Sequence, residues 1–203
     1  MGCGALEDSR PLRIRAFFGL PVPEPQRGRL GAFVAACSAV APEFRWTATS
    51  NLHLTIRFVG SVDRSSVEGI ADRLAELPIA GFEVAPGEPG TFKRGRLAIV
   101  VWLGLRLGGG AARTMAAQVE AECRAAGLKP ELRAFQPHIT LARSRHRDGG
   151  ELARLPAVPH LDPWRATALV LYSSRLARTG AMHEELRILS LGAPSPSDSA
   201  GEP

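Results

Sequence analysis

The sequence has few cysteines, and none in a pattern that would hold a fold together. Cys3, Cys37 and Cys123 are far apart, odd in number and form no C-x-x-C pair, which argues against a disulfide framework and a structural zinc site. Long apolar runs are also missing: no window approaches the ~18 apolar residues of a membrane span. Residues 1–10 lack the apolar stretch of a signal peptide. We therefore expect a cytoplasmic protein without a membrane segment.

Several motifs of large enzyme families are absent as well. The glycine run at 108–110 has no G-x-G-x-x-G or Walker spacing around it, so it is better interpreted as a turn into the next helix than as a phosphate loop. The G-x-S-x-G turn of many serine hydrolases is also missing. Any chemistry must therefore rest on other residues.

Lysine is scarce in a chain that is nevertheless basic. The chain has 25 Lys and Arg residues, of which only Lys93 and Lys129 are Lys, and its net charge is +5. A basic chain is compatible with an anionic partner such as RNA or a nucleotide. The excess of Arg can equally reflect codon composition. The basic loop containing Arg145, His146 and Arg147 is interpreted as a solvated loop in preference to an RNA backbone contact.

The most informative feature occurs twice, at residues 51–58 (NLHLTIRF) and 136–143 (QPHITLAR). Each copy is a His-x-Thr set among apolar residues. In a β-strand, successive side chains point to opposite faces, so apolar residues would share one face and polar residues the other. The predicted polar faces are His53, Thr55 and Arg57 in the first copy, and His138 and Thr140 in the second.

These histidines also have a simpler explanation. A single His-x-Thr is more often a half-buried strand histidine whose ring bonds a neighbouring hydroxyl. With 8 Thr and 5 His in 203 residues, two such matches arise by chance in roughly 1.6% of chains. The matching apolar frames make chance less probable still, so the pair favours a catalytic interpretation.

Hydrophobic periodicity predicts an α+β fold with two mainly antiparallel sheets and flanking helices. The expected helices span 26–41, 63–77 with Asp63 as cap, and 111–126 ending at Gly127. The expected strands are 12–20, 46–58 closed by Gly60, 82–92, 97–105, 132–143, 164–172 and 182–191. The 85 residues between the two histidines imply two lobes. We expect one bilobal domain over residues 11–192, with disordered tails at 1–10 and 193–203.

Two imidazoles facing each other across a cleft suit a reaction that needs a base on one side of a phosphorus atom and an acid on the other. The ordinary His pKa of ~6.5 allows one ring to be neutral while the other is protonated. Thr hydroxyls and an Arg can hold the phosphate oxygens. A metal site is the main competitor, but two His are too few ligands, and the nearby charges are Arg57 and Arg143. No metal and no cofactor are expected.

The chain resembles the two-histidine (2H) phosphoesterase superfamily, and within it the RNA 2′,3′-cyclic phosphodiesterases, once described as 2′,5′ RNA ligases. The resemblance is carried by residues 51–60 (NLHLTIRFVG), 137–143 (PHITLAR), 15–18 (RAFF) and 170–174 (VLYSS). It covers roughly residues 13–191. The paired motifs are specific for the superfamily and moderately specific for the subgroup.

This resemblance implies a bilobal, pseudo-twofold symmetric fold with both motifs in a central cleft. It implies that His138 is the general base that activates water, and that His53 is the general acid that protonates the departing 3′ oxygen and leaves a 2′-phosphomonoester. Thr55 and Thr140 would hold the phosphate, and Arg143 would be the phosphate-binding arginine.

Two further expectations concern side-chain direction. Arg143 shares strand parity with Ile139 and Leu141, so the strand must end, twist or bulge there if Arg143 is to reach the cleft. Phe17 or Phe18 could stack on a base. Because adjacent strand residues point in opposite directions, at least one of the two should lie in the core.

The expected substrate is RNA or an oligonucleotide ending in a 2′,3′-cyclic phosphate, fragments of transfer RNA among them, acted on by a monomer. Two alternatives stay open. The same machinery could act on a 2′,5′-linked oligonucleotide or a cyclic phosphate of ADP-ribose. The chain could also be an RNA-binding module without turnover, although matched histidines and threonines argue against that.

Overall fold

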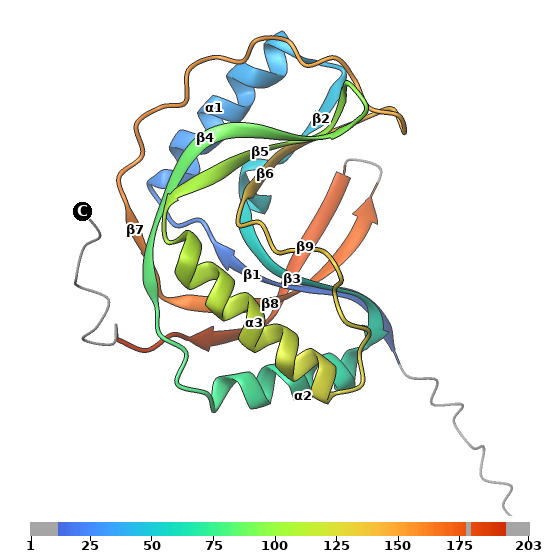
Figure 1. Ribbon diagram of the computed structural model, residues 1–203, viewed down its shortest axis with the longest axis vertical. Coiled ribbons are helices and arrows are strands. Elements are labelled where there is room, and N and C mark those ends of the chain that lie inside the picture. The colour runs from blue at the N-terminus through green and yellow to red at the C-terminus, as the bar shows by residue number, and fades with distance from the viewer. Residues whose placement is uncertain (1–11, 178–179, 194–203) are drawn as a thin grey trace, which may run out of the picture.

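The computed structural model describes residues 12–177 and 180–193 (Figure 1). The helices are α1 (Gln26–Val40), α2 (Arg64–Ala75), α3 (Gly109–Ala125) and the short 3-10 helix η1 (Thr49–Asn51). The strands are β1 (Arg13–Pro21), β2 (Phe44–Trp46), β3 (His53–Asp63), β4 (Phe82–Arg94), β5 (Leu97–Leu107), β6 (Ile139–Ser144), β7 (Trp164–Ala166), β8 (Ala168–Ala177) and β9 (Gly180–Ser190). Cys3 and the predicted tails, apart from Ala193, lie outside the described residues.

The strands form one continuous sheet in the order β7-β4-β5-β6-β3-β1-β8-β9, with β2 beside β6. Neighbouring named strands pair antiparallel, which confirms the predicted α+β class. The prediction of two separate sheets is wrong in one respect, because β3 and β6 join them through a single backbone pair, Leu54 opposite Ile139. Four strands lie on each side of this junction, in the order β3-β1-β8-β9 on one side and β6-β5-β4-β7 on the other.

Both motif strands differ from the predicted ranges. β3 does not end at Gly60 but continues to Asp63, because Gly60 takes a positive φ of 80° at a bulge where the pairing with β1 skips one residue. β6 begins only at Ile139. Residues 128–138 are irregular, since they contain two prolines that cannot donate to a ladder, and Leu132 is 90% exposed.

The three helices pack on one side of the sheet system. α1 buries four of the five apolar positions that recur at helical spacing, Leu30, Phe33, Val34 and Cys37, whereas the fifth, Val40, is exposed at its end. α1 contacts β2 and η1. α2 and α3 contact each other and β3, and α2 also contacts β1 and β9. Gly127 follows α3 with φ 78°, as predicted for a left-handed cap. No helix among the described residues is long and apolar enough to cross a membrane.

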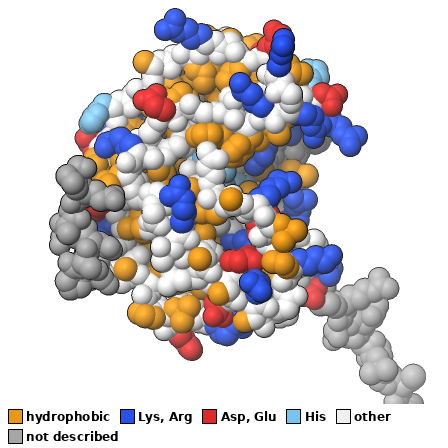
Figure 2. All heavy atoms as spheres, viewed as in Figure 1, with side chains coloured by type: hydrophobic (Ala, Val, Ile, Leu, Met, Phe, Trp, Pro, Cys, Tyr) orange, Lys and Arg blue, Asp and Glu red, His pale blue; other side chains and the backbone are white. Residues whose placement is uncertain are grey.

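The opposite face of the sheet carries a second, smaller apolar cluster. Phe18 is part of the main core, whereas Phe17 packs with Val170 and Tyr172 in the separate cluster. The adjacent phenylalanines therefore point to opposite faces, as predicted. Figure 2 shows Lys and Arg side chains gathered at the upper right, where Figure 1 places the β4–β5 hairpin.

Candidate active site

The junction between β3 and β6 brings the two His-x-Thr motifs together. Leu54 and Ile139 face each other and are both buried in the main core, so the residues on either side of each must point to the other face. Because the pairing is antiparallel, His53 lies on the same side of the junction as Thr140. His138 lies on the same side as Thr55. The sequence predicted this face from alternation alone: His53, Thr55, His138 and Thr140 are all half-buried between buried neighbours.

Both histidines are fixed by the same backbone contact. The Nδ1 of His53 lies 2.7 Å from the carbonyl oxygen of Asn51, and the Nδ1 of His138 lies 2.7 Å from the carbonyl oxygen of Gln136. A carbonyl only accepts, so each Nδ1 carries the hydrogen, and Nε2 is the nitrogen left to exchange a proton. The Nε2 of His53 lies 2.9 Å from the Thr55 hydroxyl.

The His53 ring packs against aromatic side chains. Phe17 stacks on it with ring centroids 4.7 Å apart, and Tyr172 stacks on Phe17 at 4.9 Å and lies 6.0 Å from His53. The ring of His183 on β9 stands edge-on to His53 at 5.2 Å. Because Phe17 is 2% exposed and Phe18 is fully buried, neither offers an open face to a base in this structure. The suggested base stacking is thus corrected: Phe17 supports His53 instead.

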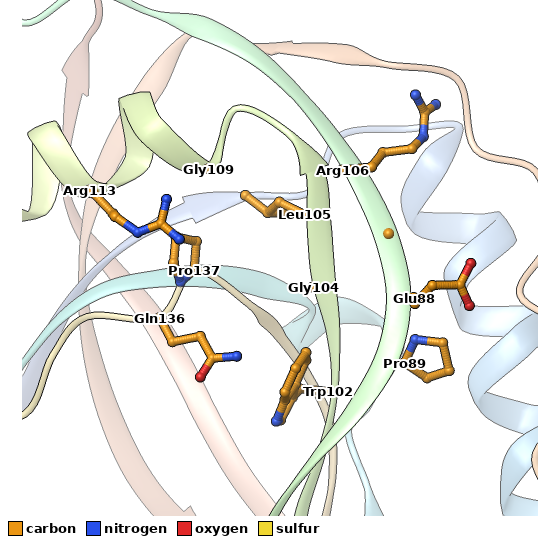
Figure 3. A pocket seen from close by; sticks show the side chains of 11 residues that line it. Glu88, Pro89, Trp102, Gly104, Leu105, Arg106, Gly109, Arg113, Gln136 and Pro137 are labelled. Atoms are coloured by element: carbon orange, nitrogen blue, oxygen red, sulfur yellow. The ribbon is translucent and has the colours of Figure 1, made fainter.

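His138 has a more open aromatic surround. Phe92 meets its ring edge-on at 5.1 Å, and Trp102 lies 6.0 Å away. Trp102 also lines a neighbouring pocket of about 510 Å³. In Figure 3, Arg113 and Gln136 lie on one side of this pocket and Trp102 below it. The pocket therefore belongs to the His138 half of the molecule.

The electrostatic surroundings favour neutral histidines in the free protein. Burial lowers the pKa of His53 to about 4, partly opposed by its bond to Asn51 and reinforced by the charges of His183, Arg143 and His138. Burial and the charge of Arg143 also lower the pKa of His138. Both rings consequently present an unprotonated Nε2 near pH 7.

A β-bulge follows each threonine and decides where the next charged residue points. On β6 the pairing passes from Thr140 opposite Trp102 to Ala142 opposite Val101, which leaves Leu141 as the extra residue. The bulge restores Arg143 to the face of Thr140, where it is exposed. This is the irregularity that the parity of Arg143 required.

The equivalent bulge on β3 has the opposite consequence for its arginine. The pairing with β1 skips Ile56, so Arg57 turns to the face of the core. There its Nε lies 2.5 Å from the Glu120 carboxylate on α3, and its side chain also bonds the Lys129 carbonyl at 2.9 Å. The prediction that Arg57 shares the face of His53 and Thr55 is therefore wrong.

The remaining predicted residues lie at the rim. Arg145, His146 and Arg147 are exposed, and Arg145 Nε donates to the Pro42 carbonyl at 3.3 Å. Arg94 on the β4–β5 hairpin holds this loop through the Arg147 carbonyl at 2.9 Å. Over residues 12–177 and 180–193, no group of three or more His, Cys, Asp or Glu residues is placed to hold a metal ion.

Comparison with known proteins places these motifs in a family. The model of the family described as LigT-like phosphoesterase matches residues 20–102 and 108–183. The chain belongs to this family. A LigT-like relative from Escherichia coli K12, named RNA 2′,3′-cyclic phosphodiesterase, is 28% identical over 180 residues, 88% of this chain and 96% of the relative. One with the same name from Aeropyrum pernix is 32% identical over 116 residues, 57% of this chain and 66% of the relative.

Solved structures of the LigT-like family share the fold. The crystal structure of E. coli LigT complexed with 3′-AMP has a TM-score of 0.75 at 26% identity, covering 89% of this chain and 99% of that one. A crystal structure described as a phosphoesterase has a TM-score of 0.75 at 28% identity, with 90% and 99% coverage.

Several residues of the site were not singled out from the sequence. Asn51 and Gln136 act through backbone carbonyls, which any residue supplies, so side-chain chemistry gave no signal. Asn51 is itself held by a 2.6 Å bond from its side-chain amide to the Ala181 carbonyl on β9. His183 reaches His53 only because β9 lies two strands from β1 in the sheet, an adjacency that local periodicity does not reveal.

Proposed function

We propose that this protein hydrolyses 2′,3′-cyclic phosphate ends of RNA and nucleotides to 2′-phosphomonoesters by acid–base catalysis between two histidines. The observation that carries the proposal is the Leu54–Ile139 junction. It brings together two imidazoles, one from each of two antiparallel strands. Each ring has its Nδ1 2.7 Å from a backbone carbonyl oxygen and its Nε2 directed to the shared face. The names of the curated relatives support the same activity.

His138 is the proposed base. Burial lowers its pKa, so its Nε2 lone pair is free at neutral pH, and the part of the chain that the structure describes contains no hydrogen-bond partner for that atom. It removes a proton from water, whose oxygen attacks the phosphorus. The bond from phosphorus to the 3′ oxygen then breaks while the bond to the 2′ oxygen is kept.

His53 is the proposed acid, which gives its Nε2 proton to the departing 3′ oxygen. Its pKa of about 4 in the free protein means that it must gain a proton when substrate binds. An anionic phosphate beside the ring favours the protonated form. Substrate binding is therefore coupled to proton uptake, and the Thr55 hydroxyl at 2.9 Å then accepts from Nε2–H until the leaving oxygen takes its place.

The phosphate oxygens are held by groups from both motifs. The hydroxyls of Thr55 and Thr140 lie on the shared face, and Arg143 is returned to it by the bulge at Leu141. An Arg side chain can donate hydrogen bonds to two phosphate oxygens at once, and these bonds strengthen as negative charge develops on the oxygens. The proposed substrates include transfer RNA fragments with cyclic ends, and the proposed acting species is the monomer.

The test is incubation of the purified protein with a nucleoside 2′,3′-cyclic phosphate, and with a short RNA ending in one, in EDTA. We expect the 2′-phosphate as product, with the cyclic end of each substrate consumed. Release of the 3′-phosphate would exchange the leaving oxygen and contradict the assignment. Binding of both substrates without product would favour an RNA-binding module, and activity that requires an added divalent ion would overturn the metal-independent mechanism.

A further inference from the structure

A second arginine lies directly beside Arg143. β2 pairs with β6 in a register that sets Arg45 opposite Arg143. Residues opposite each other in an antiparallel pair point to the same face, with Cα atoms about 4.5–5.5 Å apart. The neighbouring Phe44 is buried at 1% exposure while Arg45 is exposed, which confirms that Arg45 faces away from the core. Two guanidinium groups thus lie side by side at one end of the site.

Within residues 12–177 and 180–193, this pair has no counterion. Neither guanidinium forms a hydrogen bond or ion pair with another described residue, and like charges directly opposite each other are destabilising in a sheet. Of the acidic residues nearby, Asp148 is already 3.5 Å from Arg94, and Glu43 bonds neither arginine of the pair. An anion from outside the chain would relieve the repulsion.

The pair lies at the end of the site that His53 occupies. His53 lies on the Thr140 side of the Leu54–Ile139 junction, and Arg143 follows Thr140 along β6 in that direction. In the proposed reaction, the 3′ oxygen protonated by His53 belongs to the terminal nucleoside, so this nucleoside lies on the same side. Its 5′ end, one sugar away from the cyclic phosphate, is then the nearest further place where RNA carries a phosphate.

We infer that Arg45 binds the 5′-phosphate of the terminal nucleotide, the phosphodiester that joins it to the rest of the RNA, while Arg143 binds the cyclic phosphate. This inference rests on the proposed function and extends it to substrate class: RNA ends are preferred over mononucleoside cyclic phosphates. Further exposed basic residues lie on the adjoining β4–β5 hairpin and on the loop after β6, among them Lys93, Arg96 and Arg147.

The kinetic test compares adenosine 2′,3′-cyclic phosphate with the same compound carrying a 5′-phosphate. For Arg45→Gln we expect kcat/KM for the 5′-phosphorylated substrate to fall about tenfold, while that for the unphosphorylated one changes less than twofold. Arg45→Lys should recover part of the loss because it keeps the charge. The matched control is Arg124→Gln, an exposed arginine of α3, which should change neither substrate. Equal losses on both substrates, or no loss on either, would overturn the inference.

A binding measurement separates this inference from the proposed reaction. Calorimetry with adenosine 2′-phosphate and adenosine 2′,5′-bisphosphate needs no turnover. We expect Arg45→Gln to weaken the bisphosphate about tenfold and the monophosphate less than twofold. If the wild-type protein hydrolyses neither cyclic substrate, the proposed function fails, but the selective loss of bisphosphate affinity still supports the second phosphate site. Unchanged bisphosphate affinity would contradict it.

Discussion

The two halves of the sheet are alike up to the bulge and differ two residues beyond it. Each inner strand carries His-x-Thr, each histidine ties its Nδ1 to a carbonyl at 2.7 Å, and each strand bulges directly after the threonine. After the bulge, β6 presents Arg143 to the site. At the corresponding place β3 presents Phe58, which pairs with Phe17 and is 52% exposed.

The surroundings of the two histidines differ in the same sense. His53 is enclosed by Phe17, Tyr172 and His183, and burial lowers its pKa to about 4. His138 has two aromatic neighbours, Phe92 edge-on at 5.1 Å and Trp102 at 6.0 Å, and lies beside an open pocket. In the proposed mechanism, the symmetry supplies the two proton-exchanging groups, and the asymmetry places the positive charge at one end and so sets the direction in which the substrate binds.

The largest expected effect comes from removing either histidine. We expect His53→Gln and His138→Gln each to lower kcat by about a thousandfold or more, since each loses an acid or base worth 10²–10⁴. The double variant should be little worse than either single one, because the two act as a unit. His160→Gln, at an exposed histidine paired with Asp162, is the control and should retain full turnover. Single variants that differ greatly from each other would break the comparison.

The residues beyond the bulges should differ sharply in their effects. Arg143→Gln loses charge-assisted bonds to the phosphate, and we expect kcat/KM to fall by about a hundredfold. Its counterpart Phe58→Leu removes no charge and should lower kcat/KM less than about threefold. Steady-state kinetics on a nucleoside 2′,3′-cyclic phosphate measure both. Equal losses would mean that the positive charge does not set the direction of binding.

The two threonines should again behave alike. Thr55→Val and Thr140→Val each remove one hydroxyl that bonds a charged phosphate oxygen, a contact worth about 1.5–3 kcal/mol, so a fall of about 10- to 100-fold in kcat/KM is expected for each. The corresponding Ser variants keep the hydroxyl and should retain most activity. A loss in only one of the two Val variants would show that the phosphate is held by one half alone.

The pH dependence sharpens the comparison further. The base must be neutral and the acid protonated, so kcat/KM should be bell-shaped, with apparent pKa values that belong to the pair. Burial lowers both histidine pKa values in the free protein, and we therefore expect the optimum of kcat/KM below pH 6.5. Bound phosphate raises the pKa of both rings, which shifts the kcat profile to higher pH. A kcat/KM optimum above pH 7.5 would contradict this order.

The sequence predicted the alternation around both histidines, because local periodicity determines which face of a strand is buried. It also predicted that Phe17 and Phe18 point in opposite directions. It could not locate the bulges at Ile56 and Leu141, since a bulge depends on the strand that pairs with it. Regular alternation would have pointed Arg143 into the core, and this was the only indication of a bulge on β6. On β3, regular alternation placed Arg57 on the polar face, which gave no indication of a bulge, so the predicted direction of Arg57 was wrong.

Other features were out of reach for the same reason. The late start of β6 depends on how residues 128–138 pack, and the single junction that merges the two predicted sheets is a contact between strands 85 residues apart. The aromatic rings around His53 come from β1, β8 and β9, so their arrangement follows from the order of strands in the sheet and not from any local motif.

The division of work between the histidines can be tested directly with a substrate whose 3′ oxygen is replaced by sulfur. A thiolate leaves without needing a proton, so a variant that lacks only the acid should recover on this substrate. We expect His53→Gln to hydrolyse the 3′-thio substrate at a rate close to that of the wild-type protein, while His138→Gln stays impaired by about a thousandfold because water still needs its base. Rescue of His138→Gln in place of His53→Gln would reverse the two roles and contradict the account.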